Sequence, residues 1–390
     1  MILSQISYID CLVFLIFLTP QLLIQVGLWT TAKWVLGALP DLAVLQVPCQ
    51  FIRERFFTAR ERRSPFVQRA TLFQDIVVRY VRYAFANLPA YIGRVFLSKA
   101  VSLPLLRFRM LRHGLLKSPI SWTEVKQPNF QGIWITPDPS KKPDIVVFYC
   151  HGGGFSMGSS YFYLEFLLAW VSLLRATGYT NPSLLALEYT LVPDAVYPTQ
   201  VQQTFAGYAY ALSLVQDPSH LVVGGDSAGA TLILSMLLYV AEHPEYRGRL
   251  PGLAVMISPW VEIVSEKRRD TASDYLCAES LHLYGRQYVG SKVPEDDPMV
   301  SPGHCRDPDK WLRASPSRGW FFLYGSEEVL GPETRDLVAL LRKAGAEVEV
   351  REEEGSIHAW PVAALYLGET REERLKGLGD IVKVIRRRLH

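Results

Sequence analysis

The sequence predicts an α/β protein with a mostly parallel central sheet flanked by helices, a helical cap and an N-terminal hydrophobic helix. Strand-like apolar runs alternate with helical runs from residue 132 to the end of the chain, which is typical of a parallel sheet with helices on both faces. Loops with glycines or reactive side chains follow several of these runs, at the edge where such sheets bind ligands. An uncharged apolar stretch lies near the start of the chain.

The expected strands are short apolar runs, several of them rich in β-branched and aromatic residues, and the expected helices are longer runs. Strands are expected near residues 132–136, 144–150, 183–188, 221–224, 253–258, 319–324 and 346–351. Helices are expected near residues 161–176, 200–215, 228–242 and 333–343, with a last amphipathic helix near 371–388. The order is not broken by an internal repeat or a low-complexity segment.

Residues 1–45 are expected to form a hydrophobic membrane anchor. The chain has 390 residues and a mean hydropathy of +0.10, and no charged residue lies between Asp10 and Lys33. Roughly 20 apolar residues suffice to span a bilayer, although Pro20 and two glutamines interrupt this run. A cleaved signal peptide fits poorly, because no lysine or arginine precedes the run and no small-x-small cleavage site follows it. A spanning or hairpin anchor, a helix lying in the membrane surface and a helix packed on the rest of the protein remain open.

Residues 46–125 are expected to form a basic helical cap region. Between residues 51 and 120, fourteen arginines and lysines stand against only Glu54, Glu61 and Asp75. This charge predicts contact with anionic lipid head groups, and an ordinary solvated face is the alternative. Nucleic-acid binding is disfavoured, because no recognition motif accompanies the charge. Pro65 argues against one continuous basic helix.

Ser227 is the candidate nucleophile. It lies in Gly225-Asp226-Ser227-Ala228-Gly229, between the apolar run Leu221-Val222-Val223 and a helical stretch. In a strand–turn–helix of the G-x-S-x-G type, the glycines allow a tight turn and a close approach of strand and helix. The N-terminus of the following helix directs N–H groups and its positive dipole end toward an oxyanion formed at the serine.

A glycine-rich loop supplies the candidate oxyanion hole. His151-Gly152-Gly153-Gly154-Phe155 follows the strand expected at residues 144–150. Backbone N–H donors aimed at a developing oxyanion each contribute roughly 3 kcal/mol in such sites. We assign Gly153 and Gly154 as donors, joined by the N–H of Ala228, and we expect His151 to orient the loop because a catalytic histidine should follow the serine.

The general base and its acid partner are expected in the order serine, carboxylate, histidine. His358 lies in Gly355-Ser356-Ile357-His358-Ala359 after a late strand, where a loop can bring it to the serine. The acid should follow the strand expected at residues 319–324, where Glu327 and Glu328 are adjacent. One of the two should hold the imidazole in the correct tautomer. Alternation directs only one toward the His358 loop, and we assign Glu328.

These motifs resemble a known family. HGGGF, GDSAG, YTLVP at residues 189–193 with Pro198, Ser258-Pro259-Trp260 and IHAW at residues 357–360 resemble the hormone-sensitive-lipase-like, "fold-3" branch of α/β-hydrolases, which includes arylacetamide deacetylases and fungal steryl deacetylases. The resemblance covers residues 125–390 and implies an α/β-hydrolase catalytic domain at 126–390. The family usually has Asp-Pro-Leu at the acid position, and an ungapped alignment of that triplet places the acid on Glu328. A plant hormone receptor of this family has lost its histidine, whereas His358 is present here.

The expected function is a serine carboxylesterase or deacetylase that hydrolyses short acyl esters, such as acetyl esters, of a bulky lipophilic alcohol. The alternatives are acyl transfer with the same residues and a non-catalytic ligand-binding or scaffold protein on this fold. No cofactor and no metal are expected, because the five cysteines show no paired spacing and no phosphate loop or dinucleotide fingerprint occurs. The oligomeric state is not indicated.

The expected partners are a lipophilic ester and membrane lipids, and the expected location is the endoplasmic reticulum membrane. Asp10 before the apolar run and many arginines after it favour a cytosolic catalytic domain. The lack of an N-glycosylation acceptor agrees with this side. Related family members, however, face the lumen.

Overall fold

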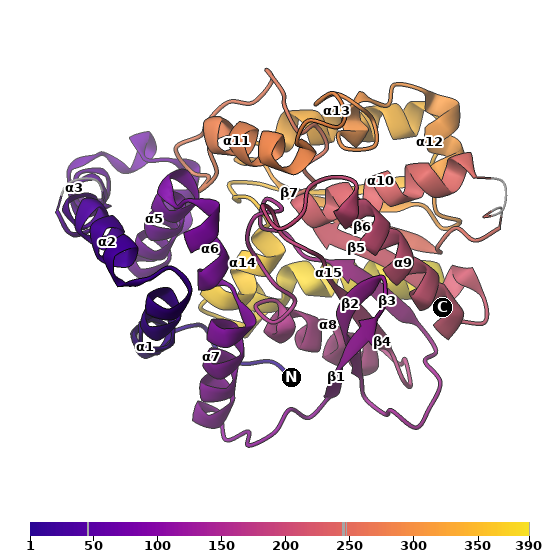
Figure 1. The fold of residues 1–390 in the computed structure, drawn as a ribbon, viewed down its shortest axis with the longest axis horizontal. Helices are drawn as coiled ribbons and strands as arrows, with labels where there is room; N and C mark the ends of the chain where they lie inside the picture. The colour runs from indigo at the N-terminus through magenta and orange to yellow at the C-terminus, as the bar shows by residue number, and fades with distance from the viewer. Residues whose placement is uncertain (45–46, 244–245, 247, 390) are drawn as a thin grey trace.

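The computed structural model describes residues 1–44, 47–243, 246 and 248–389. Its centre is an eight-stranded sheet with the order β1-β2-β4-β3-β5-β6-β7-β8 (Figure 1). β2 pairs antiparallel with β1 and β4, and all other pairs are parallel. The strands are β1 (Ser121–Gln127), β2 (Phe130–Thr136), β3 (Val146–Cys150), β4 (Ser183–Glu188), β5 (Leu221–Asp226), β6 (Leu253–Ile257), β7 (Trp320–Gly325) and β8 (Val348–Glu353).

Helices cover both faces of the sheet, because the central strands are apolar on both sides. In β3, Phe148 and Cys150 belong to one buried cluster, whereas Val147 and Tyr149 belong to the other. The helices that contribute to the first cluster are α9 (Thr199–Leu214), α10 (Ala228–Glu242), α11 (Ala278–Val289), α12 (Pro308–Ala314) and α13 (Gly331–Lys343). Those that contribute to the second include α8 (Leu164–Ala176), α14 (Trp360–Leu367) and α15 (Arg371–Leu389). This arrangement confirms the predicted fold class.

Within the described residues, seven α-helices precede the sheet and gather at one side of the molecule (Figure 1). They are α1 (Tyr8–Gln25), α2 (Leu28–Ala43), α3 (Val47–Ile52), α4 (Pro65–Arg69), α5 (Leu72–Asn87), α6 (Ala90–Phe96) and α7 (Lys99–Arg112). The π-helical turn η1 (Arg53–Phe57) follows α3. Pro65 begins α4 after the N-cap Ser64, so the basic region is broken at the predicted place. Residues 45 and 46, at the predicted boundary between anchor and cap region, lie outside the described residues.

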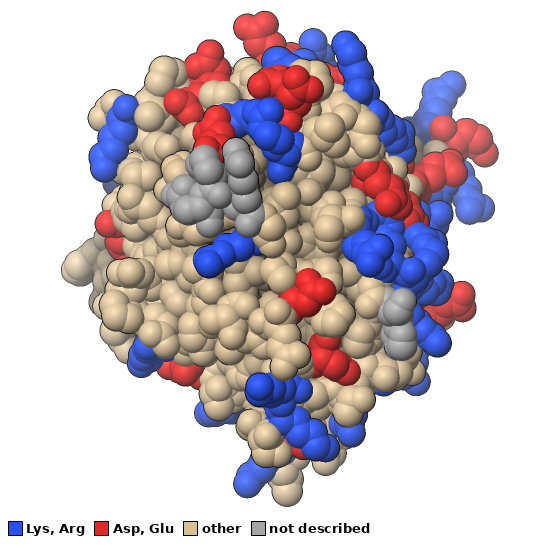
Figure 2. Space-filling view, turned by 90° about the vertical axis from the view of Figure 1, so that its right-hand side faces the viewer, with Lys and Arg blue, Asp and Glu red and all other residues tan. Residues whose placement is uncertain are grey.

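Two of the N-terminal helical segments are long and apolar enough to cross a membrane by length and composition alone. They are residues 8–25 and the segment 28–57, and most of the described residues of both are exposed. On the side of the molecule that carries α12 and the C-terminus, by contrast, lysines and arginines are mixed with acidic side chains (Figure 2). The surface chemistry of the two ends of the molecule therefore differs.

Every strand expected from the sequence is present, with its ends within two residues of the prediction. The prediction missed β1, whose sequence Ser-Trp-Thr-Glu-Val-Lys-Gln is polar. This strand lies at the sheet edge, where four of its seven residues are exposed, so it has no apolar run. It also missed α11, α12 and α14, which are only 12, 7 and 8 residues long.

Several cations of the basic cap region are bound within the protein. Arg79 is buried and donates to Asp75 and Glu54 at 2.7 Å. Arg109 is also buried and pairs with Glu165 at 3.0 Å. The interpretation of the whole basic region as a head-group surface is therefore too broad, because Asp75 and Glu54 of the region itself, and Glu165 from another segment, pair with these arginines.

Candidate active site

Ser227 lies in the turn between β5 and α10 with strained backbone angles, φ 49° and ψ −121°. A Cβ atom on Gly225 would lie 2.6 Å from the carbonyl carbon of Gly229, and one on Gly229 would lie 2.0 Å from the carbonyl oxygen of Cys150. Only glycine fits at both positions, as the motif predicts. Such strain is tolerated where the surrounding structure holds it, and it occurs at functional sites.

The glycine-rich loop follows β3 and passes beside the serine turn. Gly153 has φ +114°, and a Cβ atom there would lie 2.1 Å from the carbonyl oxygen of Met157. Gly154 has φ +61° and lies against the ring of Tyr284. Both conformations are ones that side-chain-bearing residues rarely adopt. The bare backbone that an oxyanion hole needs is thus present at Gly153 and Gly154.

His151 lies within this loop and contacts its backbone. Its Nδ1–H donates to the carbonyl oxygen of Gly152 at 2.7 Å, and its ring stacks on Tyr189 with 4.4 Å between centroids. Burial lowers the pKa of His151 to about 4, so the imidazole is neutral at pH 7. These contacts agree with the predicted role of orienting the loop.

His358 and Glu328 are brought together by the loops after β8 and β7. His358 Nδ1 lies 3.6 Å from Glu328 Oε2, and both residues are only 3 % exposed. This distance exceeds a hydrogen bond, so a small rotation of the imidazole or the carboxylate is needed to form one. Nδ1 of His358 is buried with no hydrogen-bond partner among the described residues, whereas the carboxylate of Glu328 also has the Ser258 hydroxyl as a donor.

Glu327 is directed elsewhere. Its Oε2 accepts a hydrogen bond from the Ser273 hydroxyl at 3.2 Å, and its carbonyl oxygen accepts one from Thr271. Glu327 is half-buried. The loop at residues 271–273, which is far away in sequence, covers it.

The electrostatic environment favours a protonated histidine. Burial disfavours the imidazolium, but the Glu328 carboxylate, supported by Asp274 and Asp226, outweighs this effect and raises the pKa of His358 above its ordinary 6.5. Burial raises the pKa of Glu328. A base that is stabilised when it gains a proton suits the removal of a proton from a nearby hydroxyl.

The comparisons with known proteins identify the family. A family model described as alpha/beta hydrolase fold matches residues 147–362. The chain belongs to this α/β-hydrolase family. An acetyl-hydrolase of Streptomyces hygroscopicus is 30 % identical over 233 residues, which are 58 % of this chain and 71 % of that protein.

Two further relatives extend the comparison. Steryl acetyl hydrolase 1 of Saccharomyces cerevisiae is 27 % identical over 221 residues, 53 % of this chain and 50 % of the yeast protein, so the match spans half the length of that relative. The crystal structure of an esterase from the bacterial hormone-sensitive lipase family has a TM-score of 0.61 and 24 % identity, and covers 82 % of this chain and 99 % of its own. The structural likeness shows the fold, and the predicted family is confirmed.

Asp226 links the serine turn to the glycine-rich loop of this α/β-hydrolase. The sequence reasoning assigned no role to it. It is buried, and its Oδ1 accepts hydrogen bonds from Gly152 N at 2.8 Å and from Tyr149 at 2.7 Å. Its Oδ2 accepts one from Tyr163 at 2.6 Å. Because Asp226 directly precedes the serine, it holds the glycine-rich loop beside the serine turn. A charged residue at the end of an otherwise apolar strand was the available signal.

Asp274 is a second buried carboxylate that the sequence reasoning missed. Its Oδ1 accepts from His358 N at 3.1 Å, and its Oδ2 accepts from Val329 N at 2.9 Å. Val329 follows Glu328, so one side chain holds the backbones of both loops. Arg82 of α5 in turn donates to the carbonyl oxygen of Asp274 at 2.8 Å. No local pattern marks Asp274, because its partners lie 55 and 84 residues away.

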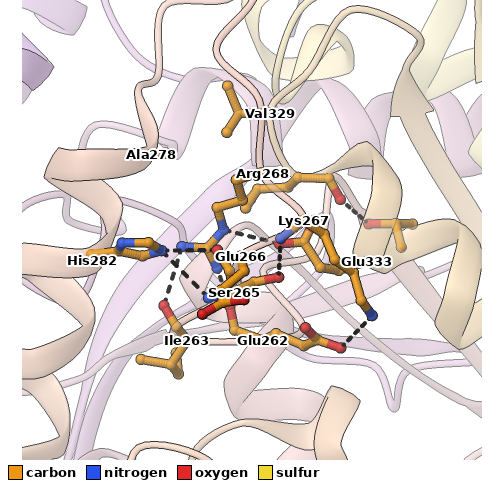
Figure 3. A network of polar contacts seen from close by, with 12 residues as sticks. Glu262, Ile263, Ser265, Glu266, Lys267, Arg268, Ala278, His282, Val329 and Glu333 are labelled. Carbon is orange, nitrogen blue, oxygen red and sulfur yellow. Dashed lines mark hydrogen bonds and ion pairs between the residues drawn. The ribbon is translucent and has the colours of Figure 1, made fainter.

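A polar network supports the segment that begins α13 (Figure 3). The buried Arg268 donates to Glu333 at 3.0 Å and to the carbonyl oxygen of Ile263 at 3.2 Å. Its guanidinium lies over the Trp260 ring, 5.5 Å from the centroid. Glu333 lies in the first turn of α13, just after Glu328 and Val329. The network therefore holds the start of α13, which directly follows the loop that carries Glu328 and Val329.

Within the ranges that the structure describes, no group of three or more histidine, cysteine, aspartate or glutamate side chains could hold a metal ion.

Proposed function

We propose that the protein is a serine carboxylic ester hydrolase in which Ser227 is the nucleophile, His358 the general base and Glu328 its acid partner. The observation that carries the proposal is the strained Ser227 turn on the same sheet edge as a buried His358–Glu328 pair at 3.6 Å. The backbone N–H groups of Gly153, Gly154 and Ala228 form the oxyanion hole. The class of enzyme agrees with the names of the relatives.

The reaction proceeds through an acyl-enzyme. His358 takes the proton of Ser227 as Oγ bonds to the ester carbonyl carbon, and the carbonyl electrons move to the oxygen that faces Gly153 and Gly154. The ester C–O bond then breaks, and His358 returns its proton to the departing alcohol. A water molecule attacks the acyl-enzyme in the same way and releases the acid and Ser227.

We propose an acetyl ester of a bulky lipophilic alcohol as substrate. Two relatives are named acetyl-hydrolase and steryl acetyl hydrolase. The exposed apolar N-terminal helices favour an enzyme that works at a membrane, where such esters partition. We place the protein at the endoplasmic reticulum with the catalytic domain on the cytosolic side. Protease protection in sealed microsomes tests this side, because a lumenal domain resists protease until detergent is added.

The test of the nucleophile is covalent labelling with a fluorophosphonate probe, followed by peptide mapping. The label should reside on Ser227, and Ser227→Ala should lose labelling and roughly four or more orders of magnitude in turnover. Ser235→Ala, which removes another buried hydroxyl in α10, is the matched control and should keep both. Turnover of Ser227→Ala within tenfold of wild type would disprove the assignment. Product analysis with a competing alcohol separates hydrolysis from acyl transfer.

A further inference from the structure

The outer faces of α1 and α2 and the turn η1 carry exposed apolar side chains, and we call these surfaces together the docking face. It is largely unpaired within the protein, since most residues of these helical segments are exposed. Six of its side chains are 58 to 85 % exposed: Leu12, Ile16, Ile24, Trp29, Leu36 and Phe57. An apolar surface of this extent is unusual on a protein bathed in water alone and marks an interaction site.

α1 is fastened to the catalytic part by its other side. Asp10 is 2 % exposed and pairs with Arg109 at 3.1 Å and Arg112 at 2.6 Å. Leu18 and Leu22 of α1 are buried in a cluster with residues of α6 and the start of α7. One side of α1 is therefore packed against the rest of the protein, and the other side is exposed. These contacts hold α1 in place on the catalytic part.

The helix beside α1 carries charges that do not suit a bilayer core. α7 packs along α1. Lys99 and Arg112 of α7 pair with Glu124 and Asp10, whereas Arg107 is exposed and has no ion pair among the described residues. If α1 crossed the membrane in this arrangement, α7 and its charged side chains would also lie within the hydrocarbon layer. Charged side chains in hydrocarbon are costly and are found paired or facing a polar cavity. This cost excludes a spanning α1 as long as the Asp10 contacts persist.

We infer that the docking face binds one leaflet of a lipid bilayer, with α1, α2 and η1 lying in its surface and none of them crossing it. The inference rests on the proposed membrane-associated esterase and decides between the forms of anchor that the sequence left open. Leu12, Ile16 and Trp29 enter the acyl region. Arg53 and Arg60, which are exposed beside Phe57, meet the lipid phosphates. This is the arrangement of an interfacial amphipathic helix.

The aromatic residues next to the docking face also suit a position at the membrane surface. Trp29, Trp34, Tyr83 and Tyr91 line a groove of about 610 Å³ between α2 and the helices α5 and α6, together with Lys33. Tryptophan and tyrosine are enriched where hydrocarbon meets head groups. The groove thus belongs to the membrane-facing side of the molecule.

α5 separates this groove from the candidate active site. Its Phe85 contacts Tyr275 with 5.3 Å between ring centroids, and Tyr275 contacts His358 at 5.8 Å. The docking face therefore holds the candidate site close to the leaflet that contains a lipophilic ester.

The first experiment measures binding of the full-length protein to preformed phosphatidylcholine–phosphatidylserine vesicles by flotation. Leu12→Glu/Ile16→Glu, which places two charges on the exposed side of α1, should reduce the bound fraction at least tenfold. The matched control is Leu283→Glu/Leu312→Glu, which adds the same charges on α11 and α12, where both leucines are also exposed. The control should bind within twofold of wild type. Equal binding of the α1 variant and wild type would overturn the inference.

The second experiment separates surface binding from spanning. A nitrobenzoxadiazole label is attached to Tyr8→Cys or Ile24→Cys, at the two ends of α1, in a Cys11→Ser/Cys49→Ser background. With protein bound to the outside of sealed vesicles, external dithionite should bleach both labels. Protection of one label until detergent is added shows a spanning helix and contradicts the inference. Both experiments read out binding and position, so they are independent of whether Ser227 is the nucleophile.

Discussion

At the scale of single residues, the proposal that Glu328, and not the adjacent Glu327, is the acid partner of His358 can be tested directly. Glu328→Gln should lower kcat by roughly four orders of magnitude, because a neutral amide beside His358 Nδ1 favours the wrong tautomer. Glu327→Gln should change kcat little, since Glu327 accepts hydrogen bonds from Ser273 and not from His358. Steady-state kinetics on a soluble acetate ester give both values. The reverse order of effects would transfer the acid role to Glu327.

Asp274 makes a second prediction at this scale. An asparagine has one acceptor oxygen where the carboxylate has two, so Asp274→Asn leaves His358 N or Val329 N without a partner and should cost about 1–3 kcal/mol of unfolding free energy. The loss of the nearby negative charge should also lower the pKa of His358. Because the neutral imidazole is the active form, the acidic limb of the kcat/KM profile should move to lower pH.

The control for this prediction is Asp270→Asn on the same loop. Asp270 is exposed and caps Ala278 N at 2.8 Å, so its variant should leave the pH profile in place. In the wild type the acidic limb should have its midpoint above the ordinary histidine value of 6.5, since the folded protein raises the pKa of His358. A profile of Asp274→Asn that matches wild type would remove Asp274 from the electrostatics of the site and leave it a purely structural role.

At the scale of elements, α1 should stabilise the catalytic part as well as contact lipid. It buries Leu18 and Leu22 against α6 and α7, which together are worth roughly 3–6 kcal/mol at typical values for buried leucines. Deleting residues 1–45 should therefore lower the Tm and expose apolar surface on α6. Leu18→Ala/Leu22→Ala in the full chain should lower the Tm while vesicle binding is retained. An unchanged Tm of the truncated protein would show that α1 is not docked as the structure has it.

At the scale of the whole molecule, the net charge of +3 predicts that lipid binding depends on salt only in part. Many cations near the N-terminal helices are neutralised within the protein, such as Arg79 and Arg109. Exposed apolar side chains should therefore carry most of the affinity. Raising the salt from 0.1 to 1 M shortens the screening length from about 10 to about 3 Å and should weaken flotation with anionic vesicles without abolishing it.

The matched variant removes three exposed cations in and next to η1. Arg53→Gln/Arg60→Gln/Arg62→Gln should bind more weakly at low salt and show little further loss at high salt. Full release of the wild type at 1 M salt would mean that electrostatics, and not the apolar docking face, dominate the attachment.

The sequence by itself determined the features that depend on local chemistry. Strand and helix alternation set the class of fold, because the burial of both faces of a parallel sheet requires it. The glycines around Ser227 and at Gly153 and Gly154 predict the serine turn and the conformation of the loop, since only glycine permits those close approaches and positive φ angles. The order of serine, carboxylate and histidine follows from the loops at one sheet edge. The polar edge strand β1 lacks such a signal.

Only the tertiary structure decided which distant groups meet. It placed Glu328 beside His358 and covered Glu327 with the loop at residues 271–273. It brought Asp274 to two loops that are 55 and 84 residues away, and it joined Asp10 to Arg109 across 99 residues. A buried carboxylate must find donors wherever folding supplies them. Those partners depend on how loops and helices pack, and the spacing of residues along the chain does not contain that information.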